Sequence, residues 1–596
     1  MVQRTVRSRV SGFIVTVLLL CVSCLLGYDT ITYSSPGGSF VVSQKAAAVS
    51  GRAFELTQSS ASPRDAHHRL GLLGLSDVAQ LPLMRMVSME GNWGGNINAI
   101  KNLPDAYVQR LKDDHVNWLY ISLPIFNTPI VDPRVRIIYR PPTDSNYANM
   151  YSFDDQDLAN AVNKLRKNGI NVFFSIMFMP AYADLSVGCN TAQYSVDSHL
   201  FGDPQPPSAK YGSAFGFECV DPELWWWNPS HPRHASNVAT FWATYTDVAI
   251  KYARLAQQLG VGALALGEET DRLFRTRSSA RFVNNFRDEL ARMVASVRAE
   301  YTGLVTYAQN GAVYTEHPEW WGYDTAAAAP LFKDLNLDVV GISAYYTLDT
   351  QAVSRVYSVP ELEDRWRSVM DKYVVPVQTM NPGIPIVFTS VGTIDSVNTL
   401  LNPLSDSGAP YEFTDSNGDG VDDGMEQQRN YYQALVNVNK ARNYPVRGLD
   451  FWGFSIDTDP SIAAYNDAHR TSELHGKPAE QVISATYAEW ELIVPGQPSA
   501  LSFSAGANTV ALFWDSPHSG GHVTSYRVEI GSTPGASDIA SVDTGNNDTT
   551  FLFRSVSSSS RFYIRVRAIG AGGPGQASNQ IMVNLRASTS GSEAGP

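Results

Sequence analysis

The stretch VGALALGEETDR, Val261–Arg272, decides the fold of this chain. Its small and apolar residues are typical of a short buried strand, and the strand ends in two adjacent carboxylates, Glu268 and Glu269. A second stretch, IPIVFTSVG, Ile384–Gly392, has the same form and reaches a polar residue at Ser390. In a barrel of parallel strands, side chains at the carboxyl ends of the strands converge on one mouth. The two stretches therefore predict a barrel with polar groups at its mouth.

Around these stretches, apolar strands alternate with amphipathic helices from residue 82 to residue 490, which indicates an α/β fold. Eight candidate strands favour a closed (β/α)8 TIM barrel over an open sheet. Two helices are well signalled, Asp157–Asn168 before Gly169 and Ser236–Leu259 before Gly260. The candidate strands are Met84–Met89, Asn117–Leu123, Asn171–Phe178, Val261–Gly267, Leu304–Ala308, Asp338–Ala344, Ile384–Val391 and Arg447–Gly453.

From residue 494 the pattern changes to short alternating strands separated by turns rich in Gly, Ser, Asn and Pro, which is typical of a β-sandwich. VALFWDSP places Trp514 in an early strand, SYRVEI follows, and RFYIRVRA supplies a late strand. Residues 494–587 resemble a fibronectin type III domain, an all-β sandwich whose fold alone specifies no ligand. We expect residues 588–596 to form a disordered tail.

The N-terminus has the features of an export signal. Three arginines precede an apolar run over residues 12–27, which is shorter than the roughly 20 residues of a membrane span. We expect residues 1–27 to be a signal peptide or signal anchor and residues 28–81 to be a linker or lead-in. The triplet that ends at Cys24 resembles a bacterial lipoprotein cleavage site. The protein is thus expected to be secreted or at the cell surface, with attachment to the membrane or cell envelope through Cys24 as one route.

The composition of the chain limits the classes of molecule that it can bind. The chain has 596 residues, 44% of them hydrophobic, and a net charge of −13, which permits a sizeable core but makes nucleic acid an unsuitable partner. We expect no organic cofactor. Outside the signal, the chain has two cysteines, Cys189 and Cys219. Export favours a disulfide between them, and two separate buried thiols are the alternative.

A second motif, DSNGDGVDDGME at residues 415–426, has the spacing of an EF-hand calcium loop. Oxygen ligands fall at places 1, 3, 5, 9 and 12, a carbonyl falls at place 7, and Gly420 occupies the sharp turn at place 6. A solvated turn rich in Asp and Gly is the alternative. We predict one structural calcium ion, held by Asp415, Asn417, Asp419, the carbonyl of Val421, Asp423 and Glu426.

The strands also carry a family resemblance. FWATYTDVAIKYARLAQQLGVGALALGEETD is similar to the run into strand four of glycoside hydrolase family 113, the β-mannanase-like retaining enzymes. VRAEYTGLVTYAQN, LDVVGISAYY, IPIVFTSVG and GLDFWGFSID resemble its strands five to eight. The resemblance implies that Glu269 is the general acid/base. The family's nucleophile, the Glu of a Thr-Glu-x-Gly motif on strand seven, maps to Ser390.

The resemblance implies a glycoside hydrolase-like protein that acts on or binds β-linked, mannan-like polysaccharide, impaired because Ser390 replaces the nucleophile. A serine hydroxyl needs an adjacent base. Glu268, Asp395 and Asp457 lie next to strand ends, and one of them could instead activate water and give inversion.

Two alternatives remain at this stage. Glu269 could serve only in a salt bridge to a nearby arginine, and the chain could be a non-catalytic carbohydrate-binding or cell-surface adhesion protein on a TIM-barrel scaffold. Aromatic faces stack on sugar rings and amides bind hydroxyls. The expected substrate-binding residues are Trp93, Trp226, Asn310, Tyr345 and Trp452.

Overall fold

A computed structural model describes two compact units, Leu75–Ile493 and a second unit made of Met1–Gly74 and Val494–Pro596. No helix among the described residues is long and apolar enough to span a membrane. The described residues are 30–35, 38–43, 55–57, 83–89, 100–127, 133–139, 151–180, 232–270, 274, 276, 285–311, 331–349, 355–401, 403, 408–442, 444, 446–455, 460–505, 509–517, 519–554 and 561–584.

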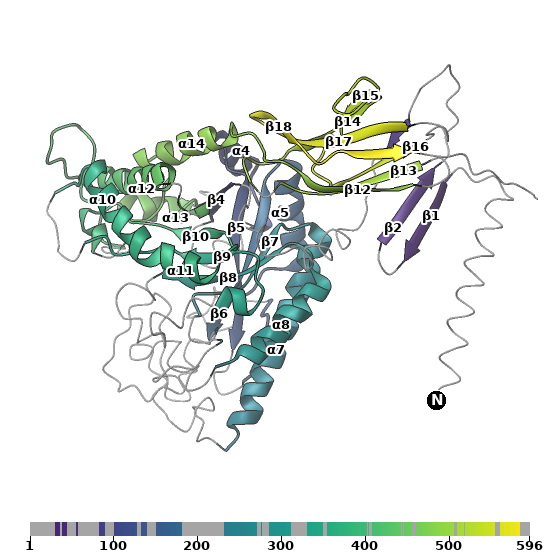
Figure 1. Ribbon diagram of the computed structural model, residues 1–596. Helices are drawn as coiled ribbons and strands as arrows, with labels where there is room; N and C mark the ends of the chain where they lie inside the picture. Colours follow the sequence, from purple (N-terminus) through teal and green to yellow (C-terminus); the bar gives the residue numbers. More distant parts are fainter. Residues whose placement is uncertain are drawn as a thin grey trace, which may run out of the picture. The chain divides into compact units, whose positions relative to one another are not determined.

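The larger unit is a closed barrel of eight parallel strands in the order β10-β11-β4-β5-β6-β7-β8-β9 (Figure 1). The barrel confirms the predicted TIM fold, and each candidate strand falls on one of its members. The strands are β4 (Met84–Ser88), β5 (Trp118–Asn127), β6 (Asn171–Pro180), β7 (Ala263–Glu268), β8 (Leu304–Asn310), β9 (Val340–Ser343), β10 (Ile386–Val391) and β11 (Val446–Trp452).

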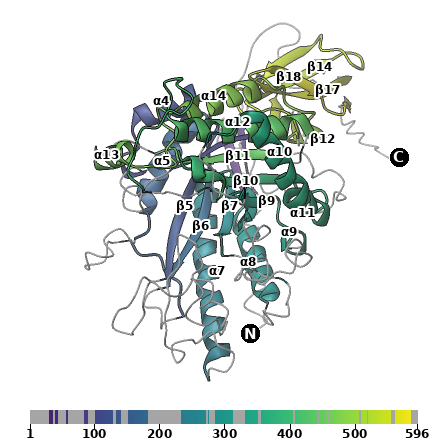
Figure 2. The same cartoon turned by 90° about the vertical axis from the view of Figure 1, so that its left-hand side faces the viewer.

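Helices follow the strands and cover the barrel (Figure 2). Both predicted helices are present as α5 and α7. In α5 the Asp154 side chain accepts the amide hydrogens of Gln156 and Asp157, and α7 ends at Gly260 with φ of 64°. The helices are α4 (Asp105–Asp113), α5 (Asp155–Lys167), α7 (His234–Leu259), α8 (Arg287–Glu300), α9 (Leu331–Asp334), α10 (Val359–Val369), α11 (Val375–Met380), α12 (Asp423–Arg442), α13 (Pro460–Ala468) and α14 (Pro478–Glu491).

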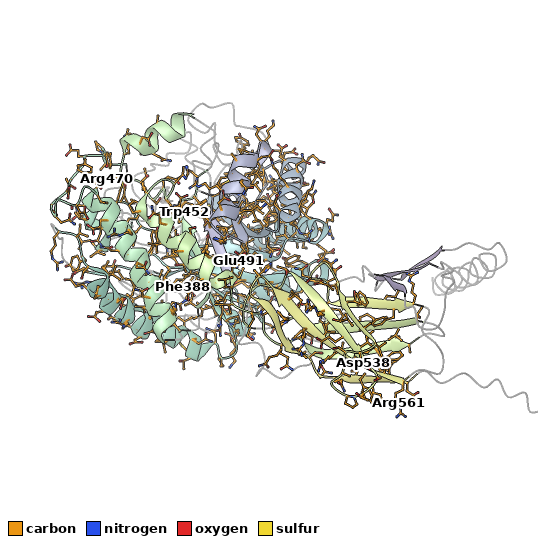
Figure 3. All side chains as sticks on the ribbon, turned by 90° about the horizontal axis from the view of Figure 1, so that it is seen from above. Phe388, Trp452, Arg470, Glu491, Asp538 and Arg561 are labelled. Carbon is orange, nitrogen blue, oxygen red and sulfur yellow. The ribbon has the colours of Figure 1, made fainter. Side chains whose placement is uncertain are left out.

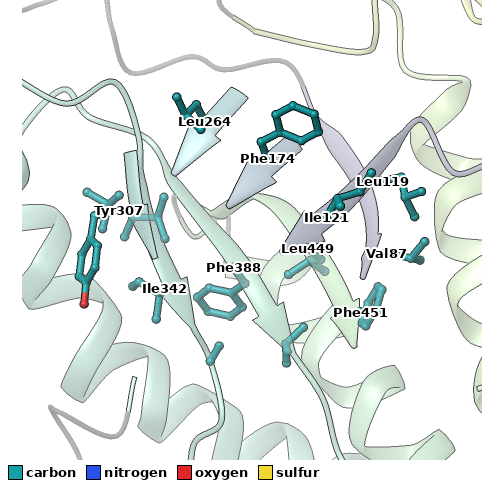
Figure 4. Packing of buried hydrophobic residues seen from close by; sticks show 14 of the residues in the cluster. Val87, Leu119, Ile121, Phe174, Leu264, Tyr307, Ile342, Phe388, Leu449 and Phe451 are labelled. Atoms are coloured by element: carbon teal, nitrogen blue, oxygen red, sulfur yellow. The ribbon is translucent and has the colours of Figure 1, made fainter. Parts of the chain in front are cut away.

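Period-two alternation divides the strand side chains between two cores. The outward side chains pack between strands and helices, as Leu119, Phe174 and Phe388 do in Figure 4. The inward side chains form a separate apolar cluster in the lumen, which includes Met86, Tyr120 and Val387. Farther along the strands, the inward positions become polar. The polar inward positions therefore lie nearer the mouth of the barrel than the apolar ones.

The described strands after residue 494 form two antiparallel sheets of the second unit, which confirms the predicted sandwich. One sheet has the order β12-β13-β16-β3, and the other has β15-β14-β17-β18 with β19 also paired to β17. Trp514 is buried at their core against Tyr526. The strands are β12 (Ser499–Ala505), β13 (Thr509–Asp515), β14 (Ser525–Gly531), β15 (Ala540–Asp543), β16 (Thr550–Arg554), β17 (Arg561–Gly570), β18 (Gly573–Ala577) and β19 (Ile581–Asn584).

Three short strands lie in the lead-in, where the sequence has only weak periodicity. β1 (Thr30–Ser35) and β2 (Gly38–Ser43) pair as an antiparallel hairpin. β3 (Glu55–Thr57) pairs antiparallel with β16, with Thr57 opposite Leu552. A segment that precedes the barrel in sequence thus extends a sheet of the C-terminal sandwich.

Candidate active site

The end of β7 turns its two glutamates in different directions. A register shift between Ala265 and Glu268 inserts an extra residue relative to β8. Gly267 faces the outer core, where an added Cβ would lie 2.9 Å from the Phe274 ring. After this bulge Glu268 points into the lumen. Glu269 follows with φ of 53°, in the left-handed region that non-glycine residues seldom adopt and that is concentrated at functional sites.

Glu268 is buried in the lumen, with 7% of its surface exposed. Its Oε2 accepts a hydrogen bond of 3.0 Å from the Ser122 hydroxyl on β5. Burial raises the pKa of Glu268 to about 7, and the adjacent Glu269 charge adds to the increase. Glu268 is therefore a carboxylic acid that changes its charge near neutral pH.

Glu269 lies at the mouth and is partly exposed. The Asn310 amide, at the end of β8, donates a hydrogen bond of 3.3 Å to its Oε2, and its own backbone N–H donates to the Ala308 carbonyl at 2.8 Å. Both contacts come from β8, the neighbouring strand, which thus fixes the position of Glu269. The structure brings together two residues that the sequence had indicated, Glu269 and Asn310.

Ser390 lies at the end of β10 and is bonded to a tyrosine. Its Oγ is 2.7 Å from the Tyr345 hydroxyl, which follows β9. Desolvation raises the pKa of Tyr345 well above its usual value of 10, and the Glu269 charge acts in the same direction. Tyr345 follows β9 and Glu269 follows β7, and these two strands flank β8 in the barrel. A neutral phenol cannot act as the base that would activate Ser390 as a nucleophile.

Trp452 closes the same side of the mouth. It ends β11, is labelled in Figure 3, and is partly exposed. Gly392 allows this close packing, because a Cβ there would lie 2.9 Å from the Trp452 Cβ and 3.0 Å from the Tyr345 ring. Glu269, Asn310, Tyr345, Ser390 and Trp452 thus all lie at carboxyl ends of barrel strands or directly after them.

Asp450 on β11 is a buried carboxyl group that the sequence reasoning did not single out. It is completely buried and accepts a hydrogen bond through Oδ2 from the Ser88 hydroxyl. Its Oδ1 has no hydrogen-bond partner within the described residues. Burial raises the pKa of Asp450 well above its usual value, and the Glu268 charge adds to the increase. An acidic residue at an inward position of the apolar strand GLDFW is the signal that could have found it.

Asp395, one of the candidate bases, belongs to a buried ion pair. Its Oδ2 lies 3.1 Å from the Lys477 Nζ, and its Oδ1 accepts the backbone N–H of Thr471 at 2.7 Å. Arg470, labelled in Figure 3, donates to the Asp395 carbonyl and also pairs with the buried Asp422. These contacts hold the loop after β10 to the segment before α14, which is a structural role.

The predicted calcium loop is closed by bonds within itself. The Asp415 carboxylate accepts the backbone N–H groups of Gly418 at 2.7 Å and Gly420 at 2.9 Å. Gly420 has φ of 84°, as the sharp turn requires. Asp423 accepts from Ser416, and Glu426 from Asn417. Within the described part of the chain, no group of three or more His, Cys, Asp or Glu side chains is arranged to hold a metal ion. Calcium thus stays a prediction from the sequence.

The remaining predicted site residues, Trp93, Trp226, Asp457, Cys189 and Cys219, lie outside the described residues.

Two family models match the chain. Residues 226–477 match Glycoside Hydrolase Family 113, and residues 496–584 match Fibronectin type III domain. The matched part of the barrel is thus similar to family 113. The match includes every described mouth residue, and the fibronectin type III domain accounts for the C-terminal sandwich. No match was found among curated proteins.

Several solved structures resemble the family 113-like barrel. A family 113 β-1,4-mannanase is 14% identical, with 68% of this chain and 99% of that chain covered and a TM-score of 0.43. The family 113 β-mannanase from Alicyclobacillus acidocaldarius is 16% identical, with 69% and 99% covered and a TM-score of 0.41. A family 5 mannosidase from Rhizomucor miehei is 11% identical, with 69% and 93% covered and a TM-score of 0.39. Such low identities and TM-scores say nothing about the activity of this chain.

Proposed function

We propose that this chain is an exported protein whose barrel binds β-linked, mannan-like polysaccharide and hydrolyses it poorly. The observation that carries the proposal is the bond between Ser390 and Tyr345, at the same end of the barrel as Glu269. The family match supports a sugar as ligand. The fibronectin type III domain then serves as a spacer or adhesion unit.

The mouth holds one of the two carboxyl groups that a retaining glycosidase uses. Such enzymes use two carboxyl groups about 5–5.5 Å apart, one as acid/base and one as nucleophile. Glu269 can give a proton to a glycosidic oxygen, because it is partly exposed and positioned by Asn310. Ser390 offers a hydroxyl whose side-chain partner is a neutral phenol, so no covalent glycosyl intermediate is expected.

Inversion would need a carboxylate that activates water. Asp395 is held by Lys477, and Asp450 is completely buried beside Ser88. Glu268 points into the lumen and is largely neutral below pH 7. These three carboxyls are thus poorly suited to that task, and Asp457 lies outside the described residues. Sugar binding with weak cleavage is the function that the described site supports best.

Two measurements test the proposal. Isothermal titration calorimetry should show mannooligosaccharide binding that weakens at least tenfold in Trp452→Ala, because an aromatic stacking face is lost. Phe503→Ala, which removes an exposed aromatic ring from the sandwich, is the matched control. A reducing-sugar screen over purified polysaccharides should show little release from β-mannan. If no β-linked polysaccharide binds, the proposed function is wrong; rapid hydrolysis would refute the impairment.

A further inference from the structure

Two exposed aromatic rings lie on segments that follow neighbouring strands of the barrel. Phe413 is 58% exposed and belongs to the segment 408–414, after β10. Tyr465 is 48% exposed and belongs to α13, after β11. Both segments leave the barrel at the carboxyl ends of its strands, the face on which barrels of this kind bind their ligands. We call the two rings the aromatic platform.

Hydrogen bonds join the two segments of the aromatic platform. The Tyr411 N–H donates to the Ala468 carbonyl at 2.9 Å, and Pro410 forms an antiparallel bridge with His469. Both rings are thereby fixed to one small scaffold. Single exposed apolar residues are ordinary on a protein surface, but a group of them on one scaffold indicates an interaction site.

The Tyr465 ring is supported on one face. It stacks on the His469 imidazole, with the ring centroids 4.0 Å apart and an angle of 17° between the ring planes. Gly408 leaves room for the far end of the ring, because a Cβ there would lie 2.8 Å from the Tyr465 hydroxyl oxygen. Since His469 covers one face, the exposed part of Tyr465 includes the opposite face of its ring.

The backbone on both sides of Phe413 is held by a buried ion pair. Arg470 and Asp422 pair with each other and are 9% and 2% exposed. Arg470 donates to the carbonyl of Glu412, directly before the ring. Asp422 accepts the backbone N–H of Thr414, directly after the ring, at 3.0 Å. A ring held in this way loses little conformational entropy when a ligand covers it.

The same scaffold is bonded to the loop that leaves the mouth. Arg470 donates to the Asp395 carbonyl at 2.9 Å, and the Asp395 N–H donates to the Thr471 carbonyl at 3.2 Å. Asp395 lies in the short stretch that follows Ser390 at the end of β10. The aromatic platform is thus connected, through bonded segments, to the side of the mouth that β10 and β11 form.

The side chains beside the aromatic platform favour a neutral ligand. Glu412 and Asp467 are exposed acidic residues of its segments, whereas Arg470 is buried in its ion pair. These charges repel polyanions such as nucleic acid and acidic polysaccharides. A sugar ring can stack its C–H face on an aromatic ring, and Thr414 and Asn466, each next in sequence to a platform ring, can bond its hydroxyls.

We infer that the aromatic platform is a second carbohydrate site, which binds the chain of a neutral β-linked polysaccharide beyond the units that the mouth holds. The inference rests on the proposed function for the kind of sugar. A long chain that contacts both sites binds more tightly than a short one, because the second contact is intramolecular once the first is made. A short oligosaccharide occupies the mouth alone.

The test compares a long and a short ligand on the full chain. Affinity electrophoresis in gels that contain soluble glucomannan measures the long ligand, and calorimetry with mannotriose measures the short one. Tyr465→Ala and Phe413→Leu should each weaken glucomannan binding roughly tenfold, since one of two linked contacts is impaired. Both variants should bind mannotriose as the wild type does. Trp452→Ala should weaken the binding of both ligands.

Matched variants separate ring stacking from other causes. Phe413→Tyr keeps an aromatic face and should bind glucomannan like the wild type, whereas Phe413→Leu keeps only apolar bulk. Phe503→Ala removes an exposed ring from β12 in the sandwich and should change neither affinity. Polygalacturonate, an anionic polymer, should not bind. Melting temperatures of all variants establish that they are folded.

Failure of the inference and failure of the proposed function give different results. If the wild type binds mannotriose, but Tyr465→Ala and Phe413→Leu keep full affinity for glucomannan, the inference alone is wrong. If glucomannan binding depends on the platform while mannotriose does not bind, the inference stands and the proposed role of the mouth is wrong. If the wild type binds neither mannotriose nor any neutral polysaccharide, both are wrong.

Discussion

Replacing Glu268 by glutamine should make the barrel more stable at alkaline pH. Glu268 is buried, and its pKa is raised from 4.5 to about 7. The folded chain thus keeps a proton that the unfolded chain releases between these two values. The contribution of the Glu268 proton to the free energy of unfolding is therefore fully present below pH 4.5. It decreases as the pH rises to about 7 and is lost above that pH. The groups that act on Glu268 include Tyr120, Glu269 and Asp450, none of which supplies a positive charge.

The magnitude follows from the size of the shift. A rise of roughly 2.5 pKa units, at about 1.36 kcal/mol per unit, corresponds to about 3 kcal/mol of stability lost between pH 4.5 and pH 8. Glutamine keeps the shape and can still accept the Ser122 hydrogen bond, but it carries no charge. Glu268→Gln should thus flatten the pH dependence and exceed the wild type in stability at pH 8.

Scanning calorimetry from pH 4.5 to pH 8 is the appropriate assay, because it can resolve the barrel transition from that of the sandwich. Asp114→Asn is the matched control. Asp114 lies at the end of α4, and burial raises its pKa to about 6, so its removal should affect a lower pH range. Parallel pH curves for wild type and Glu268→Gln would refute the reasoning.

Four further predictions concern other parts of the chain. Ser390→Glu should create hydrolysis of β-mannan, measured as reducing sugar, since it restores a second carboxylate; if Ser390→Ala is harmless to a rapid native hydrolysis, the account of Ser390 is wrong. EGTA should lower the melting temperature of the wild type but not of Asp415→Ala, and a purified protein that contains no calcium and ignores EGTA would exclude the ion. Non-reducing mass spectrometry should find the peptides of Cys189 and Cys219 linked, whereas two free thiols would contradict the disulfide. Arg470→Met should cost about 3–5 kcal/mol of stability, because it leaves the buried Asp422 uncompensated, and Asp422→Asn in the same chain should recover part of this loss.

Much of the fold was predictable because its signals are local. The alternation of apolar residues indicated all eight barrel strands, and Gly260 marked the end of α7. The bulge that turns Glu268 inward was not predictable, because it depends on how β7 pairs with β8. β3 was missed for a related reason. A three-residue strand has no measurable period, and its partner β16 is far away in sequence.

The sequence predicted which residues lie at the site better than it predicted the contacts between them. Glu269, Asn310, Tyr345 and Ser390 lie at the ends of apolar strands or directly after them, so their place at the mouth could be inferred. The bond between Tyr345 and Ser390 joins two strands, and no spacing rule gives it. Likewise, the position of Asp395 after a strand suggested chemistry, but its partner Lys477 appears only in the folded chain. A strand pattern shows that Asp450 faces inward, but it does not show which side chains of other strands surround it. Asp450 could therefore not be recognised as a site residue from the sequence.

The pairing of β3 with β16 has a consequence for biosynthesis. β3 is made before the barrel and β16 after it, so this sheet can be completed only when nearly the whole chain has been synthesised. Joining segments about 500 residues apart also costs more chain entropy than joining neighbours. A three-residue strand offers few hydrogen bonds to offset that cost, so β3 should be the first strand to detach. Its departure would expose the unpaired backbone of β16, and this edge is then the part of the sandwich most prone to aggregation.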